Sequence, residues 1–170
     1  WQGRRALSPH HPVMCVSWYE AQAYANAVGK RLPTEAEWEK AASWDPALNK
    51  KRSQPWGDSA PHRERCNTEA HLAGTSAVDQ HPAGESAYGC MDMQGNVWEW
   101  TATWFHPYPE FTPYPYDGYS LPYFDQRHRV LRGGSWATRS HVIRPTFRNW
   151  YNPWVREIFA GFRCAQSSHT

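Results

Sequence analysis

The sequence lacks three features that each mark a large class of proteins. It has no excess of charge of one sign, because 18 Lys and Arg stand against 16 Asp and Glu for a formal net charge of +2. It has no apolar run approaching the roughly 18 residues of a membrane span, and no pattern typical of a secretory leader. These absences argue against nucleic acid and membrane as partners and favour a cytoplasmic location.

Cysteine is sparse and scattered. The four cysteines are Cys15, Cys66, Cys90 and Cys164, and none forms a C-x-x-C pair. Such spacing favours buried free thiols in a reducing compartment, and it leaves a disulfide or a metal site as the alternatives.

Aromatic residues, by contrast, are abundant: 11 Trp, 9 Tyr and 6 Phe accompany 14 Pro and 11 Gly. This composition predicts a loop-rich fold whose core is filled by large rings. A length of 170 residues corresponds to one domain or part of one. Because the chain opens without Met and meets an apolar pattern at once, we expect it to begin within a larger protein.

Local patterns predict a few short elements. The segments S-W-Y-E (17–20) and T-E-A-E (34–37) are capping boxes followed by apolar residues at helical spacing, so each predicts a helix. Short strands are expected at 13–16, 77–78, 97–100, 129–132 and 159–165. Residues 106–123 form a Pro- and Tyr-rich loop, and loops of this length are often functional. The class predicted is α+β.

Five motifs occur in order along the chain, and together they resemble the formylglycine-generating enzyme (sulfatase-modifying factor) superfamily, whose fold is related to C-type lectins. They lie at 16–42, 55–58, 88–101, 129–136 and 160–165. The resemblance implies a loop-rich α+β fold with two short helices and short antiparallel strands. It starts partway into the family's domain, so residues 1–170 are expected to form a partial domain that lacks its N-terminal portion.

The segment after the G-G-S turn distinguishes among members of this superfamily. Formylglycine-generating enzymes oxidise a substrate cysteine with two cysteines located there, and the resemblance places those positions at Thr138 and Ile143. Neither side chain ligates copper or exchanges a disulfide, so this activity is disfavoured.

The F-R-N-W segment (147–150) and its surroundings are instead similar to the C-terminal domain of the iron(II)-dependent sulfoxide synthases of ergothioneine biosynthesis. That resemblance implies an oxidoreductase that uses O2 to join a thiol to the imidazole C2 of trimethylhistidine. Two alternatives stay open. One is a sulfoxide synthase of the ovothiol type, which joins cysteine to histidine; the other is a lectin-like module that binds a ligand without chemistry.

The same resemblance implies that iron is bound elsewhere. In that family, three histidines of an N-terminal helical domain hold iron(II), two of them in an H-x-x-x-H-x-E motif. The nine histidines of this chain contain no H-x-x-x-H pattern. We therefore expect the iron ligands on an N-terminal iron-binding helical domain outside this chain.

Substrate-binding residues follow from the family's motif. Asn149 and Trp150 match the pair that binds the betaine, since an amide can hydrogen-bond a carboxylate and an indole attracts a quaternary ammonium; the alternative for Trp150 is core packing. Tyr151 and Val155 stand where relatives that use γ-glutamylcysteine have Asp and Arg, which favours free cysteine as the thiol donor. Arg156 is the alternative cation at this place.

Tyrosines of the 106–123 loop are candidates for proton donation. We expect Tyr114 and Tyr116 to be catalytic, and the remaining tyrosines, Tyr108, Tyr119 and Tyr123, to pack.

A calcium site is the last implication. In formylglycine-generating enzymes, the segment matching residues 92–99 wraps one Ca²⁺. The corresponding ligands here are the side chains of Asp92 and Glu99 and the backbone carbonyls of Gly95 and Val97, which are hard oxygen donors suited to calcium. The alternative is that the two carboxylates stabilise turns.

Overall fold

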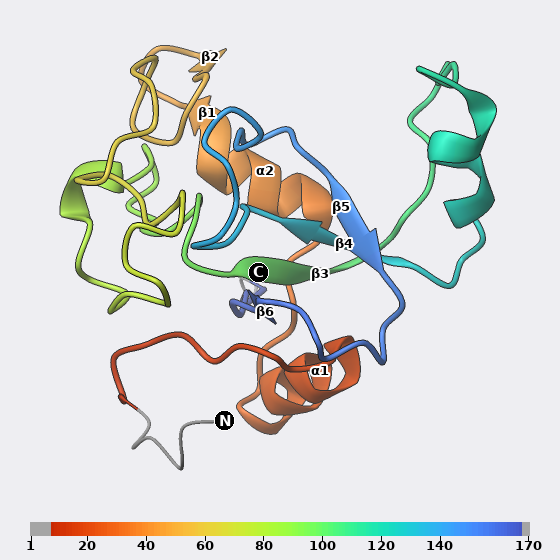
Figure 1. Cartoon of the computed structure of the whole chain (residues 1–170), viewed down its shortest axis with the longest axis horizontal. Helices are drawn as coiled ribbons and strands as arrows, with labels where there is room; N and C mark the ends of the chain where they lie inside the picture. The colour runs from red at the N-terminus through yellow and green to blue at the C-terminus, as the bar shows by residue number, and fades with distance from the viewer. Residues whose placement is uncertain (1–7, 168–170) are drawn as a thin grey trace.

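Two short helices and a four-stranded sheet form the framework of the computed structural model, which describes residues 8–167 (Figure 1). Helix α1 spans Trp18–Ala27 and helix α2 spans Glu35–Ser43. Both begin at the predicted capping boxes. The Ser17 hydroxyl accepts a hydrogen bond from the Glu20 N–H, and Thr34 does the same for Glu37. No helix within residues 8–167 is long and apolar enough to cross a membrane.

The sheet has the strand order β5-β4-β3-β6. Its members are β3 (Trp98–Trp104), β4 (Arg129–Arg132), β5 (Asn149–Tyr151) and β6 (Ala160–Gly161). Strands β3, β4 and β5 pair in antiparallel fashion, whereas β6 runs parallel to β3. The expectation of antiparallel strands alone is therefore wrong for β6. A separate hairpin joins β1 (Trp44–Asp45) to β2 (Lys50–Lys51).

Two expected strands do not form. Residues 13–16 lie next to β6, but the positive φ of Cys15 (60°) interrupts the extended backbone. Only the Val16 N–H reaches the Ala160 carbonyl, at 3.5 Å. Residues 77–78 likewise make a single backbone hydrogen bond to another segment, from the Val78 N–H to the His10 carbonyl at 2.9 Å; the Ala77 carbonyl accepts only from Gln80, within the local turn. One hydrogen bond each is too few to propagate a ladder.

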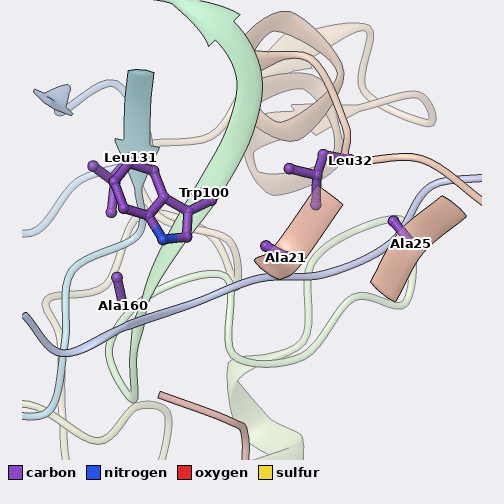
Figure 2. Packing of buried hydrophobic residues seen from close by; sticks show 6 residues of the cluster. All are labelled: Ala21, Ala25, Leu32, Trp100, Leu131 and Ala160. Carbon is purple, nitrogen blue, oxygen red and sulfur yellow. The ribbon is translucent and has the colours of Figure 1, made fainter. Parts of the chain in front are cut away.

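The core lies between helix α1 and the sheet. Trp100 of β3 is opposite Leu131 of β4, and both are fully buried. Figure 2 shows these two side chains together, with Leu32 and the alanines of α1 beyond them. Ala21 and Ala25 have no exposed surface, so their small side chains allow the helix to lie close to the indole-bearing sheet.

The Pro- and Tyr-rich segment stands out on the side of the sheet away from the 50–90 loops (teal in Figure 1). It contains two 3₁₀ turns, η2 (Asp117–Tyr119) and η3 (Leu121–Tyr123); a third, η1, spans Pro82–Gly84. The segment connects β3 to β4, and β5 is the edge strand next to β4. This topology brings the tyrosines close to Asn149 and Trp150.

All four cysteines are free thiols. Cys66 is buried, and burial raises the pKa of its thiol, whereas Cys15 is exposed. The expectation of free thiols thus agrees with the structure, but their burial holds fully only for Cys66.

Candidate functional site

Trp150 is fixed by an aromatic stack. Its backbone pairs with Val130 of β4, which places the indole next to the end of β3. The Trp150 and Phe105 rings are parallel to within 8°, and their centroids are 4.2 Å apart. Phe105 is itself buried, so one face of the indole is covered by a side chain that has little freedom to move.

The same phenylalanine contacts Arg148. The Arg148 guanidinium carbon lies 4.7 Å from the Phe105 centroid and 4.4 Å from that of Tyr108. Its Nε and Nη2 donate to the buried Glu35 carboxylate of helix α2 at 2.6 and 2.8 Å. The first turn of α2 therefore anchors Trp150 through Arg148 and Phe105.

A cavity of about 440 Å³ lies against Trp150. Its aromatic wall includes Tyr123, whose ring centroid is 5.5 Å from that of Trp150, and Tyr119 at 6.2 Å. The full lining consists of Tyr116, Gly118, Tyr119, Tyr123, His128, Asn149, Trp150, Tyr151 and Asn152. A wall of indole and phenol rings is the environment that attracts an organic cation.

The Asn149 side chain supplies the polar end of the cavity. Its Oδ1 accepts a hydrogen bond from the backbone N–H of Trp150 at 2.9 Å. This bond occupies the amide oxygen, and the NH₂ group of the same amide takes no part in it. Among the hydrogen bonds of residues 8–167 the NH₂ group has no acceptor, so it is free to donate to a carboxylate.

The structure brings together some of the predicted site residues and separates others. Asn149, Trp150, Tyr151 and Tyr116 all line the cavity. Tyr114 does not line it and is 82% exposed.

Arg156 also lies outside the cavity lining, because its guanidinium pairs with Glu20 of helix α1. The structure therefore gives it a partner other than a ligand.

Sequence reasoning missed part of the wall. Tyr119 and Tyr123 were expected to pack, yet both line the cavity and are 51% and 38% exposed. His128 was not singled out at all. Its Nδ1 lies 2.9 Å from the Asp125 Oδ1. The one available signal was the spacing of an acid and a histidine three residues apart, just before the V-L-R motif.

The proposed calcium ligands are near one another, and one of the two carboxylates already has a cationic partner. The two Glu99 oxygens accept hydrogen bonds from Arg163 at 2.5 and 2.6 Å, and Oε2 also accepts one from the Trp38 indole at 2.7 Å. A guanidinium thus already neutralises this carboxylate.

Asp92 is less constrained than Glu99, because its Oδ2 accepts a hydrogen bond from Asn96 at 3.2 Å whereas its Oδ1 has no partner among the described residues. Burial raises the pKa of its carboxyl to about 6, and the negative charge of Glu99 acts in the same direction, against a hydrogen bond from Asn96. Calcium prefers ionised oxygens with free lone pairs. Glu99 is thus held in an ion pair with Arg163, and Asp92 takes no part in that pair.

Within residues 8–167, no group of three or more His, Cys, Asp or Glu side chains is arranged to hold a metal ion.

Thr138 and Ile143, the positions of the cysteine pair in formylglycine-generating enzymes, meet at Gly134. A Cβ placed on Gly134 would lie 3.1 Å from Ile143 Cγ1 and 3.6 Å from Thr138 Cβ. The Thr138 hydroxyl accepts a hydrogen bond from the Ser135 N–H at 2.9 Å. This corner is filled by a hydroxyl and an aliphatic side chain that cannot perform thiol chemistry.

Comparison with known proteins defines the class. The model of the sulfatase-modifying factor enzyme 1-like domain matches residues 2–168. The chain therefore belongs to the sulfatase-modifying factor family, and the predicted α+β fold of that family is confirmed.

Two curated relatives are hercynine oxygenases. That of Mycobacterium tuberculosis is 49% identical over 154 residues, which cover 91% of this chain. That of Mycolicibacterium thermoresistibile is 48% identical over 163 residues, or 94% of this chain. The chain spans 36% of the length of each. Among solved structures, PvdO from Pseudomonas aeruginosa matches with a TM-score of 0.68 and 27% identity, covering 95% of this chain and 64% of that one.

Proposed function

We propose that this chain is the substrate-binding part of a non-haem iron, O2-dependent sulfoxide synthase. The reaction joins the sulfur of a thiol to C2 of the imidazole of trimethylhistidine, a step of ergothioneine biosynthesis. The observation that carries the proposal is the cavity at Trp150, where an aromatic wall and the Asn149 amide lie side by side. The relatives named hercynine oxygenase support it further.

The cavity offers complementary groups to the two ends of a betaine. The trimethylammonium group lies on the rings of Trp150, Tyr119 and Tyr123, and each cation–π contact contributes roughly 0.5–2 kcal/mol. The carboxylate accepts a hydrogen bond from the Asn149 NH₂ group. Iron, held by residues outside this chain, supplies the activation of O2 in this proposal.

Tyr116 is the better placed of the two candidate proton donors. It lines the cavity, whereas Tyr114 is directed to solvent. A phenol at this wall can donate a proton to a group that gains charge during the reaction.

The thiol donor proposed is free cysteine. The positions that hold Asp and Arg in the γ-glutamylcysteine-using relatives are Tyr151 and Val155 here, which have no charge to offer a dipeptide. Arg156, the alternative cation, is already paired with Glu20. Steady-state kcat/KM for cysteine should exceed that for γ-glutamylcysteine, and a Tyr151→Asp, Val155→Arg double variant should shift the preference toward the dipeptide. A wild-type preference for γ-glutamylcysteine would overturn this assignment.

Calorimetric titration of the full-length protein with trimethylhistidine tests the assignment of the cavity. Trp150→Leu removes the cation–π face, so we expect binding to weaken by about tenfold or more. Trp150→Phe retains a ring and should bind with intermediate affinity. Tighter binding of histidine than of trimethylhistidine would favour the ovothiol-type reaction. Absence of turnover with iron, O2 and both thiols would favour a lectin-like module.

A further inference from the structure

The cavity at Trp150 presents no carboxylate of its own to a cation. Its lining consists of tyrosines, amides, Gly118, Trp150 and one imidazole, that of His128. A cation that leaves water for such a wall loses hydration, and a nearby negative charge would offset that loss. One source of negative charge is the residue that His128 contacts.

That residue is Asp125. The His128 Nδ1 and Asp125 Oδ1 atoms are 2.9 Å apart, and the two side chains are 13% and 31% exposed. The Arg127 N–H also donates to Oδ1, at 2.8 Å. Burial raises the pKa of the Asp125 carboxyl, but the hydrogen bonds from His128 and Arg127 outweigh it, and the pKa lies below its ordinary value.

The ionised carboxylate fixes the tautomer of the imidazole. Because an ionised carboxylate can only accept, the proton of the ring lies on Nδ1. In the neutral ring, Nε2 then carries a lone pair and is an acceptor. Within residues 8–167 the only hydrogen bond of this ring is the one to Asp125, so Nε2 remains available.

The pair also contacts the aromatic wall directly. The His128 ring packs edge-to-face on Tyr123, with centroids 5.2 Å apart and planes at 88°, and Tyr123 contacts Trp150. The imidazole therefore joins the same wall as the indole. Its charge state bears on any cation held there.

Other charged groups near this wall do not neutralise the negative charge of Asp125. The Arg129 guanidinium turns away, lying 4.0 Å from the Trp18 ring and 3.3 Å from the Trp104 ring. Asp117 and Arg127 are exposed and make no ion pair within the described part of the chain. The remaining titratable groups of the lining are the phenols of Tyr116, Tyr119, Tyr123 and Tyr151.

We propose that Asp125 and His128 form the anionic wall of the Trp150 cavity, select an organic cation as its ligand, and weaken its binding when the imidazole gains a proton. This inference rests on the proposed function. With a neutral imidazole the pair carries one negative charge, and with a protonated imidazole it carries none. His128 lines the cavity, and Asp125, which contacts it from outside the lining, supplies the negative charge.

The test uses the full-length protein and glycine betaine as the probe. Glycine betaine carries a trimethylammonium and a carboxylate but no imidazole, so its charge is constant between about pH 5.5 and pH 8, where a histidine ordinarily gains a proton. We expect the wild-type affinity to fall by roughly tenfold from the higher to the lower pH. His128→Gln keeps the Asp125 charge and removes the ring that can gain a proton, so the affinity at pH 8 should stay within about twofold of the wild type and should no longer change with pH.

Asp125→Asn and its matched control isolate the carboxylate. Asp125→Asn should weaken binding by on the order of tenfold at pH 8, whereas Asp117→Asn, which removes an exposed carboxylate from the same segment, should bind as the wild type does. Melting temperatures establish that each variant is folded, and Asp125→Glu should restore part of the affinity. If a variant fails to fold, the pH dependence of glycine betaine binding to the wild-type protein still tests the proposal.

The outcomes separate this inference from the function on which it rests. Trimethylhistidine binding at pH 8 that is unaffected by Asp125→Asn, or wild-type glycine betaine binding that does not change with pH, would overturn the anionic wall and leave the proposed function in place. A wild-type protein that binds neither trimethylhistidine nor glycine betaine would overturn both.

Discussion

The buried carboxylate of Glu35 is the point where stability and the site meet, and its removal gives a measurable prediction. Glu35 is 4% exposed and accepts hydrogen bonds from Arg132 at 2.9 Å and from Arg148 at 2.6 and 2.8 Å. Glu35→Gln keeps the shape of the side chain and removes its charge. Two guanidinium groups then lose a buried counterion.

The cost follows from what each arginine retains. Breaking a buried ion pair by removing one partner costs about 3–5 kcal/mol. Arg132 keeps the Glu39 carboxylate and the Pro145 carbonyl, so we expect the lower end, about 3 kcal/mol. In a domain of this size, 1 kcal/mol shifts the melting temperature by about 2–4 °C. The melting temperature of Glu35→Gln should therefore fall by roughly 6–12 °C.

Thermal unfolding followed by near-UV circular dichroism measures this change, with Glu64→Gln as the control. Glu64 is exposed and lies 3.7 Å from His62, so its removal should cost less than about 1 kcal/mol. Because Arg148 contacts Phe105, Glu35→Gln should also weaken trimethylhistidine binding. A Glu35→Gln variant that melts within about 2 °C of the wild type would refute the reasoning that this cluster anchors the site.

Three further predictions concern charge and the tyrosines. The pKa of Asp92 is raised from its ordinary value of 3.8 to about 6, so the folded state favours the protonated carboxyl. This contribution to stability is present below about pH 3.8 and is lost as the pH rises through about 6. Asp92→Asn should therefore raise the free energy of unfolding by about 1–3 kcal/mol at pH 8 but not at pH 4, as measured by urea titration. Since Arg163 already neutralises Glu99, neither EGTA nor added Ca²⁺ should move the melting temperature, and a rise of several degrees with Ca²⁺ would contradict the ion-pair assignment. Tyr116→Phe should lower kcat by about 100-fold or more while Tyr114→Phe leaves it unchanged, and equal effects would remove Tyr116 from its assigned role.

The helices could be predicted because their signals are local. A capping box places donor and acceptor three residues apart, and both Ser17 and Thr34 make the expected bonds. The strands are harder, since β5 has three residues and β6 has two, too few to show an alternating pattern. The parallel pairing of β6 depends on Trp98, about sixty residues earlier in the chain, which no local pattern encodes.

The site divides in the same way. Asn149 and Trp150 could be nominated from the sequence because they lie within one motif on one short strand, and both line the cavity. Tyr119, Tyr123 and His128 depend on the conformation of a long segment that is fixed by ring contacts and by the Asp125–His128 hydrogen bond. The Glu35–Arg148 pair joins residues 113 positions apart, so pattern reasoning could not have found it.

The connection between β4 and β5 is held at both of its ends. At its start, Gly133 and Gly134 turn the chain. At its end, the Pro145 and Thr146 carbonyls accept hydrogen bonds from the fully buried side chain of Arg132, the last residue of β4. We therefore expect β5, the strand that bears Trp150, to stay in place when exposed side chains between these two anchor points are substituted. The connection between β4 and β5 can thus be treated as a separate unit of the fold. Substituting Thr138 and Ile143 would show how far the side chains of this connection alone determine the chemistry.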